Sequence, residues 1–223
     1  MTNINEDYLK FLNLVNRNAT NNNISVDKPR FILLFRTVLN KYVEWILEKR
    51  NGDDVRYIAP LLSLEVPLTL SSKKEQFDEF ELPDDYFDLA NLHVYAESGN
   101  CKKQRMTTFE AKIEDIEELL NDENNKPSFS FRETFFLTSN KNAIVYKDGF
   151  SINKVLLSYY RYPKQVDISG YTHLDGTPST DINPELDAKV IDRVLLAMAK
   201  EFSAINGDTA KYQLDKDRLF TEI

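Results

Sequence analysis

The sequence predicts an α+β protein in which long N- and C-terminal helices pack together around an antiparallel β-sheet middle region. Three observations predict this class. Two segments with helical periodicity, 29–50 and 184–206, each begin beside a proline. Between them, residues 61–163 contain short runs of strand-like residues separated by turn residues. Two amphipathic helices that flank such a region are expected to cover each other's apolar faces.

The first long helix has the broader apolar pattern. Asp27 is placed to cap it, Pro29 fits its first turn, and Asn51-Gly52 ends it. Its apolar residues cover more than one narrow stripe, so we expect contacts on two sides. One side belongs to its own domain, and the other contacts either the same core or a neighbouring chain. Residues 1–24, with helical periodicity at 5–17 and an Asn-rich end, form a separate N-terminal helix and linker.

The second long helix is expected to begin with Asn183 as its cap and Pro184 at its first position, and to end at Asn206-Gly207-Asp208. The main α+β domain then covers residues 25–210, which leaves 211–223 as a C-terminal arm. This arm carries apolar residues that we expect to dock on the domain or on a neighbour, with a disordered tail as the alternative. They are Leu219, Phe220 and Ile223.

The middle region is expected to form an antiparallel meander. Glycine and asparagine residues mark its turns, at Gly99, Asn140 and Gly149. The exception is the segment after Leu82-Pro83, where Tyr86-Phe87 is expected to open a short aromatic helix.

Composition excludes several classes of protein. The chain has 223 residues, 42% of them hydrophobic, and a net charge of −8. Nucleic-acid backbones are bound by Lys and Arg, so an acidic chain is a poor candidate for wrapping DNA. No apolar stretch approaches the ~20 residues of a membrane span, and the N-terminus lacks signal-peptide features. The single cysteine, Cys101, has no internal partner, so we expect folding in a reducing cytosol.

No residue pattern indicates catalysis, metal binding or cofactor binding. His93 and His173 lie far apart, and Cys101 has no CxxC partner. The segment 175–181 lacks the spacing of a calcium loop and is interpreted as a solvated turn. No phosphate-binding glycine motif and no GxSxG motif occur. The sequence therefore predicts a protein without cofactor that is not an enzyme.

Aromatic residues supply candidates for an association surface. The run at 159–164 mixes tyrosines with Arg161 and Lys164, which fits either base stacking or an edge strand, and we favour the strand. Aromatic side chains are enriched at the centres of protein interfaces. The aromatic interface candidates are Trp45, Tyr159, Tyr160 and Tyr162.

The order of these segments resembles a known family. Leu82-Pro83-Asp84-Asp85-Tyr86 is followed by the Tyr159-to-Pro163 strand end, the loop with Gly170, Asp175 and Gly176, and then Asn183-Pro184-Glu185-Leu186 before the last long helix. This order resembles the head–tail adaptors of short-tailed bacteriophages, of the tail tubular protein A type. It is most similar to the neck ring proteins of crAss-like phages.

The resemblance implies a virion structural protein that folds in the host cytoplasm and resides in the neck. Its expected partners are copies of itself in a ring, commonly twelve-fold, the portal protein, and adjacent tail or neck rings, with DNA passing through unbound and no membrane contact. Acidic residues are expected to face the DNA channel, and the candidates are Asp115, Glu117, Glu118, Asp122 and Glu123. The alternatives are a non-viral binding or scaffold module and an enzyme with an unrecognised site.

Overall fold

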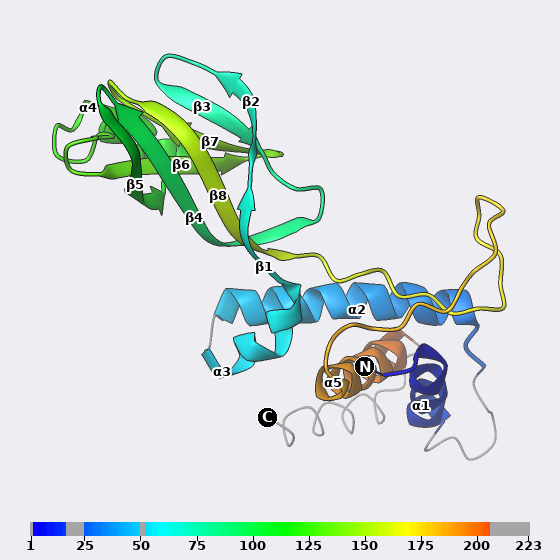
Figure 1. Ribbon diagram of the computed structural model, residues 1–223. Coiled ribbons are helices and arrows are strands. Elements are labelled where there is room, and N and C mark those ends of the chain that lie inside the picture. The colour runs from blue at the N-terminus through cyan, green and yellow to red at the C-terminus, as the bar shows by residue number, and fades with distance from the viewer. Residues whose placement is uncertain (1, 17–24, 50–51, 206–223) are drawn as a thin grey trace. The chain divides into compact units, whose positions relative to one another are not determined.

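A computed structural model describes residues 2–16, 25–49 and 52–205, and the chain forms two compact units (Figure 1). A helical unit combines segments 1–60 and 163–223, and a sheet unit is the continuous segment 61–162. The mixed α+β class is therefore confirmed. The first helix of the chain has only 13 residues, so the 22-residue helix that follows it, rather than the terminal one, is the longest described.

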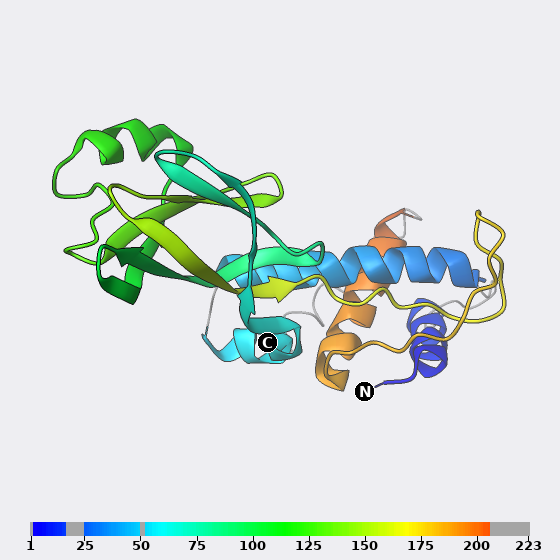
Figure 2. The same cartoon turned by 45° about the horizontal axis from the view of Figure 1, so that its top comes forward.

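The helical unit contains α1 (Ile4–Asn16), α2 (Lys28–Lys49), α3 (Gly52–Val55), the 3-10 helix η1 (Arg56–Leu61) and α5 (Ala188–Ile205). The C-terminal helix α5 packs against both α1 and α2. Figures 1 and 2 show α1 and α5 on the same side of α2, with α5 crossing it. Residues 163–187 run back along α2 as an irregular loop.

Aromatic rings fill the junction of the three helices. Phe11 of α1 lies between Phe31 of α2 and Phe202 of α5, with ring centroids 5.5 and 6.0 Å away. All three side chains are buried, so α1 shares the core of α2 and α5. The sequence instead placed residues 1–24 outside the main domain.

The helix α5 begins four residues later than expected. Asp187 is its cap residue, because its Oδ1 accepts a hydrogen bond from the Lys189 backbone N–H at 2.9 Å. The preceding Glu185 accepts a hydrogen bond from the Lys164 backbone N–H at 2.8 Å, which holds residues 184–187 in the loop. The predicted helix start at Pro184 is therefore wrong.

Eight strands form one sheet in the order β1-β8-β4-β5-β6-β7-β3-β2. The strands are β1 (Leu62–Pro67), β2 (Thr69–Lys73), β3 (Phe77–Glu81), β4 (Tyr86–Ser98), β5 (Cys101–Glu110), β6 (Glu133–Ser139), β7 (Asn142–Tyr146) and β8 (Ser151–Arg161). The two end strands of this order, β1 and β2, are separated in the chain only by Leu68. The sheet must therefore curl until its ends meet, as Figure 2 shows.

Two predictions for this region are wrong. The sheet is not entirely antiparallel, because β5 and β6 pair in parallel, with Phe109 opposite Phe135. A parallel pair needs a long connection, which residues 111–132 supply with the 3-10 helix η2 (Ile113–Asp115) and α4 (Ile116–Asn121). Tyr86 begins a strand rather than a helix, since it pairs with Arg161 of β8.

Apolar side chains fill the inside of the curled sheet. Leu92, Val94, Val155 and Leu157 are among the fully buried residues of β4 and β8. A smaller apolar group around Phe135 and Tyr146 is covered by α4, whose apolar residues pack on it. These α4 residues are Ile116, Leu119 and Leu120. The acidic residues between them consequently point away from the sheet.

Candidate association surfaces

The loop 163–187 folds back on itself beside α2. Two isolated β-bridges, Asp167 with Ile182 and Thr172 with Pro178, pair its outgoing and returning halves. We call residues 167–182 the hairpin, and residues 173–177 at its end the hairpin tip. Figures 1 and 2 show the hairpin projecting past the N-terminal end of α2.

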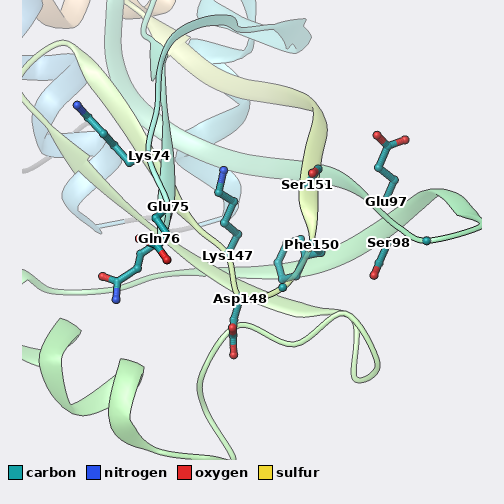
Figure 3. A pocket seen from close by; sticks show the side chains of 11 residues that line it. Lys74, Glu75, Gln76, Glu97, Ser98, Lys147, Asp148, Phe150 and Ser151 are labelled. Carbon is teal, nitrogen blue, oxygen red and sulfur yellow. The ribbon is translucent and has the colours of Figure 1, made fainter.

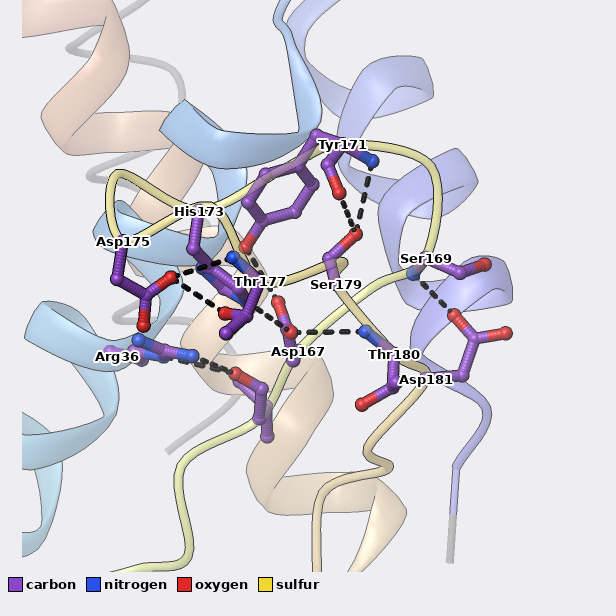
Figure 4. A network of polar contacts seen from close by, with 11 residues as sticks. Arg36, Asp167, Ser169, Tyr171, His173, Asp175, Thr177, Ser179, Thr180 and Asp181 are labelled. Atoms are coloured by element: carbon purple, nitrogen blue, oxygen red, sulfur yellow. Dashed lines mark hydrogen bonds and ion pairs between the residues drawn. The ribbon is translucent and has the colours of Figure 1, made fainter.

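A buried carboxylate organises the hairpin (Figure 4). Asp167 is only 4% exposed, and it accepts hydrogen bonds from the Tyr171 hydroxyl at 2.6 Å, the His173 Nε2 at 3.0 Å and the Thr180 backbone N–H at 3.2 Å. Burial alone would raise the pKa of Asp167, but these donors hold it below the usual value. Burial and the same carboxylate raise the pKa of Tyr171 to about 12.

Two cationic side chains of α2 anchor the base of the hairpin. The Arg36 guanidinium donates twice to the Val166 carbonyl, at 2.9 and 2.8 Å. Lys28 donates to the Ser169 carbonyl at 2.6 Å. The Ser169 backbone N–H in turn donates to the Asp181 carboxylate at 2.7 Å, so both halves of the hairpin are fixed to α2 (Figure 4).

The hairpin tip is a closed turn with an uncovered apolar residue. The His173 backbone N–H donates to the Thr177 carbonyl, and the Asp175 carboxylate accepts from the Thr177 backbone N–H and hydroxyl. Gly176 has a φ of 84°, a conformation that favours glycine. Leu174 is fully exposed, so a rigid turn presents an isolated leucine to solvent.

The opposite end of α2 carries a mixed aromatic and basic surface. We call it the cation–aromatic cluster, and its residues are Tyr42, Trp45, Lys49, Arg56, Tyr57 and Arg193. Arg193 of α5 donates to the Tyr42 hydroxyl at 3.1 Å and lies 5.4 Å from the ring centroid of Tyr57. Lys49 Nζ lies 4.2 Å from the Trp45 centroid. The three rings are only partly buried, so the sequence-predicted interface residue Trp45 belongs to an accessible cluster.

The connection between β5 and β6 concentrates the negative charge of the sheet unit. Residues 110–123 contain seven acidic residues and one basic residue, whereas the rest of 61–162 contains eleven of each. Of the predicted channel residues, Asp115, Glu118 and Asp122 line one hollow of about 380 Å³ together with Phe109 and Leu119. The remaining two, Glu117 and Glu123, are exposed outside this hollow. Hydrogen bonds from the Asn124 backbone N–H and the Asn125 side chain lower the pKa of Asp122.

A second, polar hollow of about 860 Å³ lies at one end of the curled sheet (Figure 3). Its lining mixes both signs of charge and includes Lys74, Glu75, Glu97, Lys147 and Asp148. Lys147 forms an ion pair with the buried Asp78 carboxylate, at 2.5 Å. The other charged lining residues of the hollow are one lysine and three acidic residues, so this lining offers no site for an anion.

The predicted aromatic strand is confirmed as part of β8, but the edge position is wrong, because β8 lies between β1 and β4. Tyr159 is buried, and its hydroxyl donates to Asp85 at 2.7 Å. Tyr160 is partly buried, whereas Tyr162 is half exposed and its ring packs on Phe87 at 4.5 Å. Of this strand, Tyr162 is the residue most open to a partner. Leu219, Phe220 and Ile223 lie outside the described residues.

The described residues contain one pair with the geometry of an acid–base device, Asp167 and His173. A carboxylate that orients an imidazole needs a nucleophile on the other ring nitrogen for hydrolysis. The nearby Ser179 hydroxyl is instead bonded to the Tyr171 backbone, donating to its carbonyl at 2.7 Å and accepting from its N–H at 3.0 Å. The described ranges also hold no group of three His, Cys, Asp or Glu side chains suited to a metal ion.

None of the helices in the described parts of the chain is both long and apolar enough to cross a bilayer. No known protein family matches the sequence, and no curated protein matches it.

Proposed function

We propose that this chain is a non-enzymatic subunit of a head–tail connector ring, which joins a phage portal to the tail and surrounds the DNA channel. The order of its segments, from Leu82-Pro83 to the last long helix, supports this proposal through its resemblance to short-tailed phage adaptors. In such a subunit α2 and α5 would be the paired long helices on which the rest is built. The partners would be further copies of the chain, the portal, and adjacent tail or neck rings in the virion.

The observation that carries the proposal is the charge of residues 110–123. This segment holds the net negative charge of the sheet unit, and α4 packs its apolar residues inward so that its acidic side chains face solvent. A channel wall for DNA has to guide the duplex without gripping it. Each Lys or Arg contact with a phosphate adds affinity, whereas exposed carboxylates repel the backbone. We therefore propose that Asp115, Glu117, Glu118, Asp122 and Glu123 face the channel.

The proposal is tested by reversing charge in particles. Glu117→Lys/Glu118→Lys should let the wall bind phosphates, so virions that carry this variant should release DNA more slowly, and the delay should shrink as salt rises. The matched control is Glu75→Lys/Glu81→Lys, which changes the net charge equally at two exposed positions of β3 and its preceding turn. Equal release rates for the two variants would place the acidic segment away from the channel.

A further inference from the structure

We propose that the hairpin tip of one chain docks on the cation–aromatic cluster of a second copy, in a head-to-tail contact. This inference specifies the contact between neighbouring copies in the proposed connector ring, and it rests on that proposed function. The two surfaces belong to the same helical unit but lie at opposite ends of α2, which spans about 33 Å at 1.5 Å per residue. The tip of a chain is therefore remote from its own cluster.

The hairpin tip has the properties of an inserting group. Leu174 is fully exposed, while the turn beneath it is closed by hydrogen bonds and the hairpin base is held by Arg36 and Lys28. Little conformational entropy remains to be lost when such a turn binds. Asp175 adds a carboxylate beside the leucine. The Asp175 Oδ1 accepts hydrogen bonds from Thr177.

The cation–aromatic cluster offers the matching chemistry. The rings of Tyr42 and Trp45, with centroids 6.0 Å apart, provide apolar surface for Leu174. Lys49 is exposed beside Trp45, and Arg193 lies between Tyr42 and Tyr57, so positive charge flanks the rings, with the Asp54 carboxylate offsetting part of the charge of Arg193. An apolar residue next to an acidic one fits a surface of rings next to cations. Tyr, Trp and Arg are also the residue types that dominate binding energy at protein interfaces.

The geometry of the two patches favours a ring. When two different surfaces of one chain meet, the growing row of copies keeps a free tip at one end and a free cluster at the other, so assembly continues, and it ends in a ring where the rotation closes. The tip is small, and stable interfaces bury at least about 1,000 Å². The contact alone is therefore weak, and we expect monomers in dilute solution and a ring where a portal holds the copies side by side.

Cross-linking between two differently labelled chains tests the contact. Both carry Cys101→Ser, which removes the exposed native thiol. One chain also carries Thr172→Cys, near the tip, and the other carries Glu48→Cys, at an exposed position beside the cluster that leaves all of its residues in place. A short bis-maleimide should join this pair about tenfold faster than it joins Thr172→Cys to Leu33→Cys, a matched control at a residue of α2 that is 69% exposed.

Adding Leu174→Asp to the first chain should return cross-linking to the control rate. If the control pair reacts equally fast, or if Leu174→Asp has no effect, the docking inference is wrong. These outcomes are distinct from those of the proposed function. Absence of the protein from virions would refute the connector and leave the cross-link intact, whereas a connector ring whose neighbours touch elsewhere would leave no tip-dependent cross-link.

Discussion

The side-chain oxygen of Asn183 accepts a hydrogen bond from the backbone N–H of Ile4 at 3.0 Å, so a residue of the late loop satisfies a free amide at the start of the first helix, which Asn3 caps. The first amides of a helix have no partner within the helix, and a cap residue satisfies one of them. Asn183 therefore ties α1 to the loop that also carries the hairpin.

Removing this hydrogen bond should weaken the helical unit. We expect Asn183→Ala to lower the free energy of unfolding by about 1 kcal/mol, the usual net contribution of one hydrogen bond. Urea denaturation followed by circular dichroism measures this change. Asn40→Ala, at an exposed position of α2, is the matched control and should cause no loss. Equal effects of the two substitutions would show that the Asn183 contact contributes nothing.

Asp7 of α1 should destabilise the fold at neutral pH. Its side chain is fully buried and has no hydrogen-bond partner among the described residues, while Lys10 Nζ is 3.9 Å away. Burial raises the pKa of Asp7, although the neighbouring Thr2 hydroxyl and Lys10 oppose this shift. Because the folded state holds the proton more tightly than the unfolded state, stability falls as pH rises from the unfolded pKa through the raised folded pKa.

Asp7→Asn should therefore raise the melting temperature at pH 7 and flatten its decline over this acidic-to-neutral window. Thermal melts at several pH values measure both effects. Glu6→Gln, at an exposed neighbouring position, is the control and should change neither. A lower melting temperature for Asp7→Asn at pH 7 would mean that the carboxylate is paired after all.

The Asp167 network should make the hairpin less stable at low pH, which is opposite to the effect of Asp7. Its folded pKa is lowered, so its contribution to stability is complete above the unfolded pKa and is lost as pH falls through the folded value. Tyr171→Phe removes one donor to a buried carboxylate, which typically costs about 1–3 kcal/mol.

Hydrogen exchange measures this effect locally. Exchange of the Ser179 and Thr180 amides, which bond to Tyr171 and Asp167, should speed up in Tyr171→Phe. Amides of the sheet unit, such as that of Val145, should be unchanged. Uniform acceleration across the chain would indicate global destabilisation and contradict a local role for the network.

The contact of α5 with α1 and α2 should be a main source of stability. Leu195 is 1% exposed, and truncating a buried leucine typically costs about 2–5 kcal/mol. We expect Leu195→Ala to lower the denaturation midpoint strongly, and Leu33→Ala, at an exposed position, to change it little. A shift no larger than that of Leu33→Ala would exclude α5 from the core of the unit.

Local sequence patterns predicted the elements better than their partners. The proline, glycine and asparagine signals located α2 and the turns at Gly99, Asn140 and Gly149, because these depend on the backbone of adjacent residues. Asn183-Pro184 has every local feature of a helix start, yet Asn183 bonds the first amide of α1 and Asp187 caps α5. Which of two good caps a helix uses is decided by tertiary contacts.

The direction of β6 and the exposure of Leu174 also depend on tertiary contacts that local sequence patterns do not show. Alternation of side chains is identical in parallel and antiparallel strands, so only the folded connection 111–132 reveals the parallel pair. Leu174 lies in a segment that has every mark of a solvated turn. Its presentation depends on Asp167 bonding Tyr171 and His173, and the cation–aromatic cluster joins residues from α2, η1 and α5.

The most direct test of the connector proposal is an electron-microscopy reconstruction of this protein bound to its portal or in the virion neck. The proposal predicts a closed ring of copies between portal and tail, around the DNA channel, with residues 110–123 facing inward. The contradicting result is a protein that is absent from virions and forms an isolated two-fold dimer with a ligand in a deep cleft.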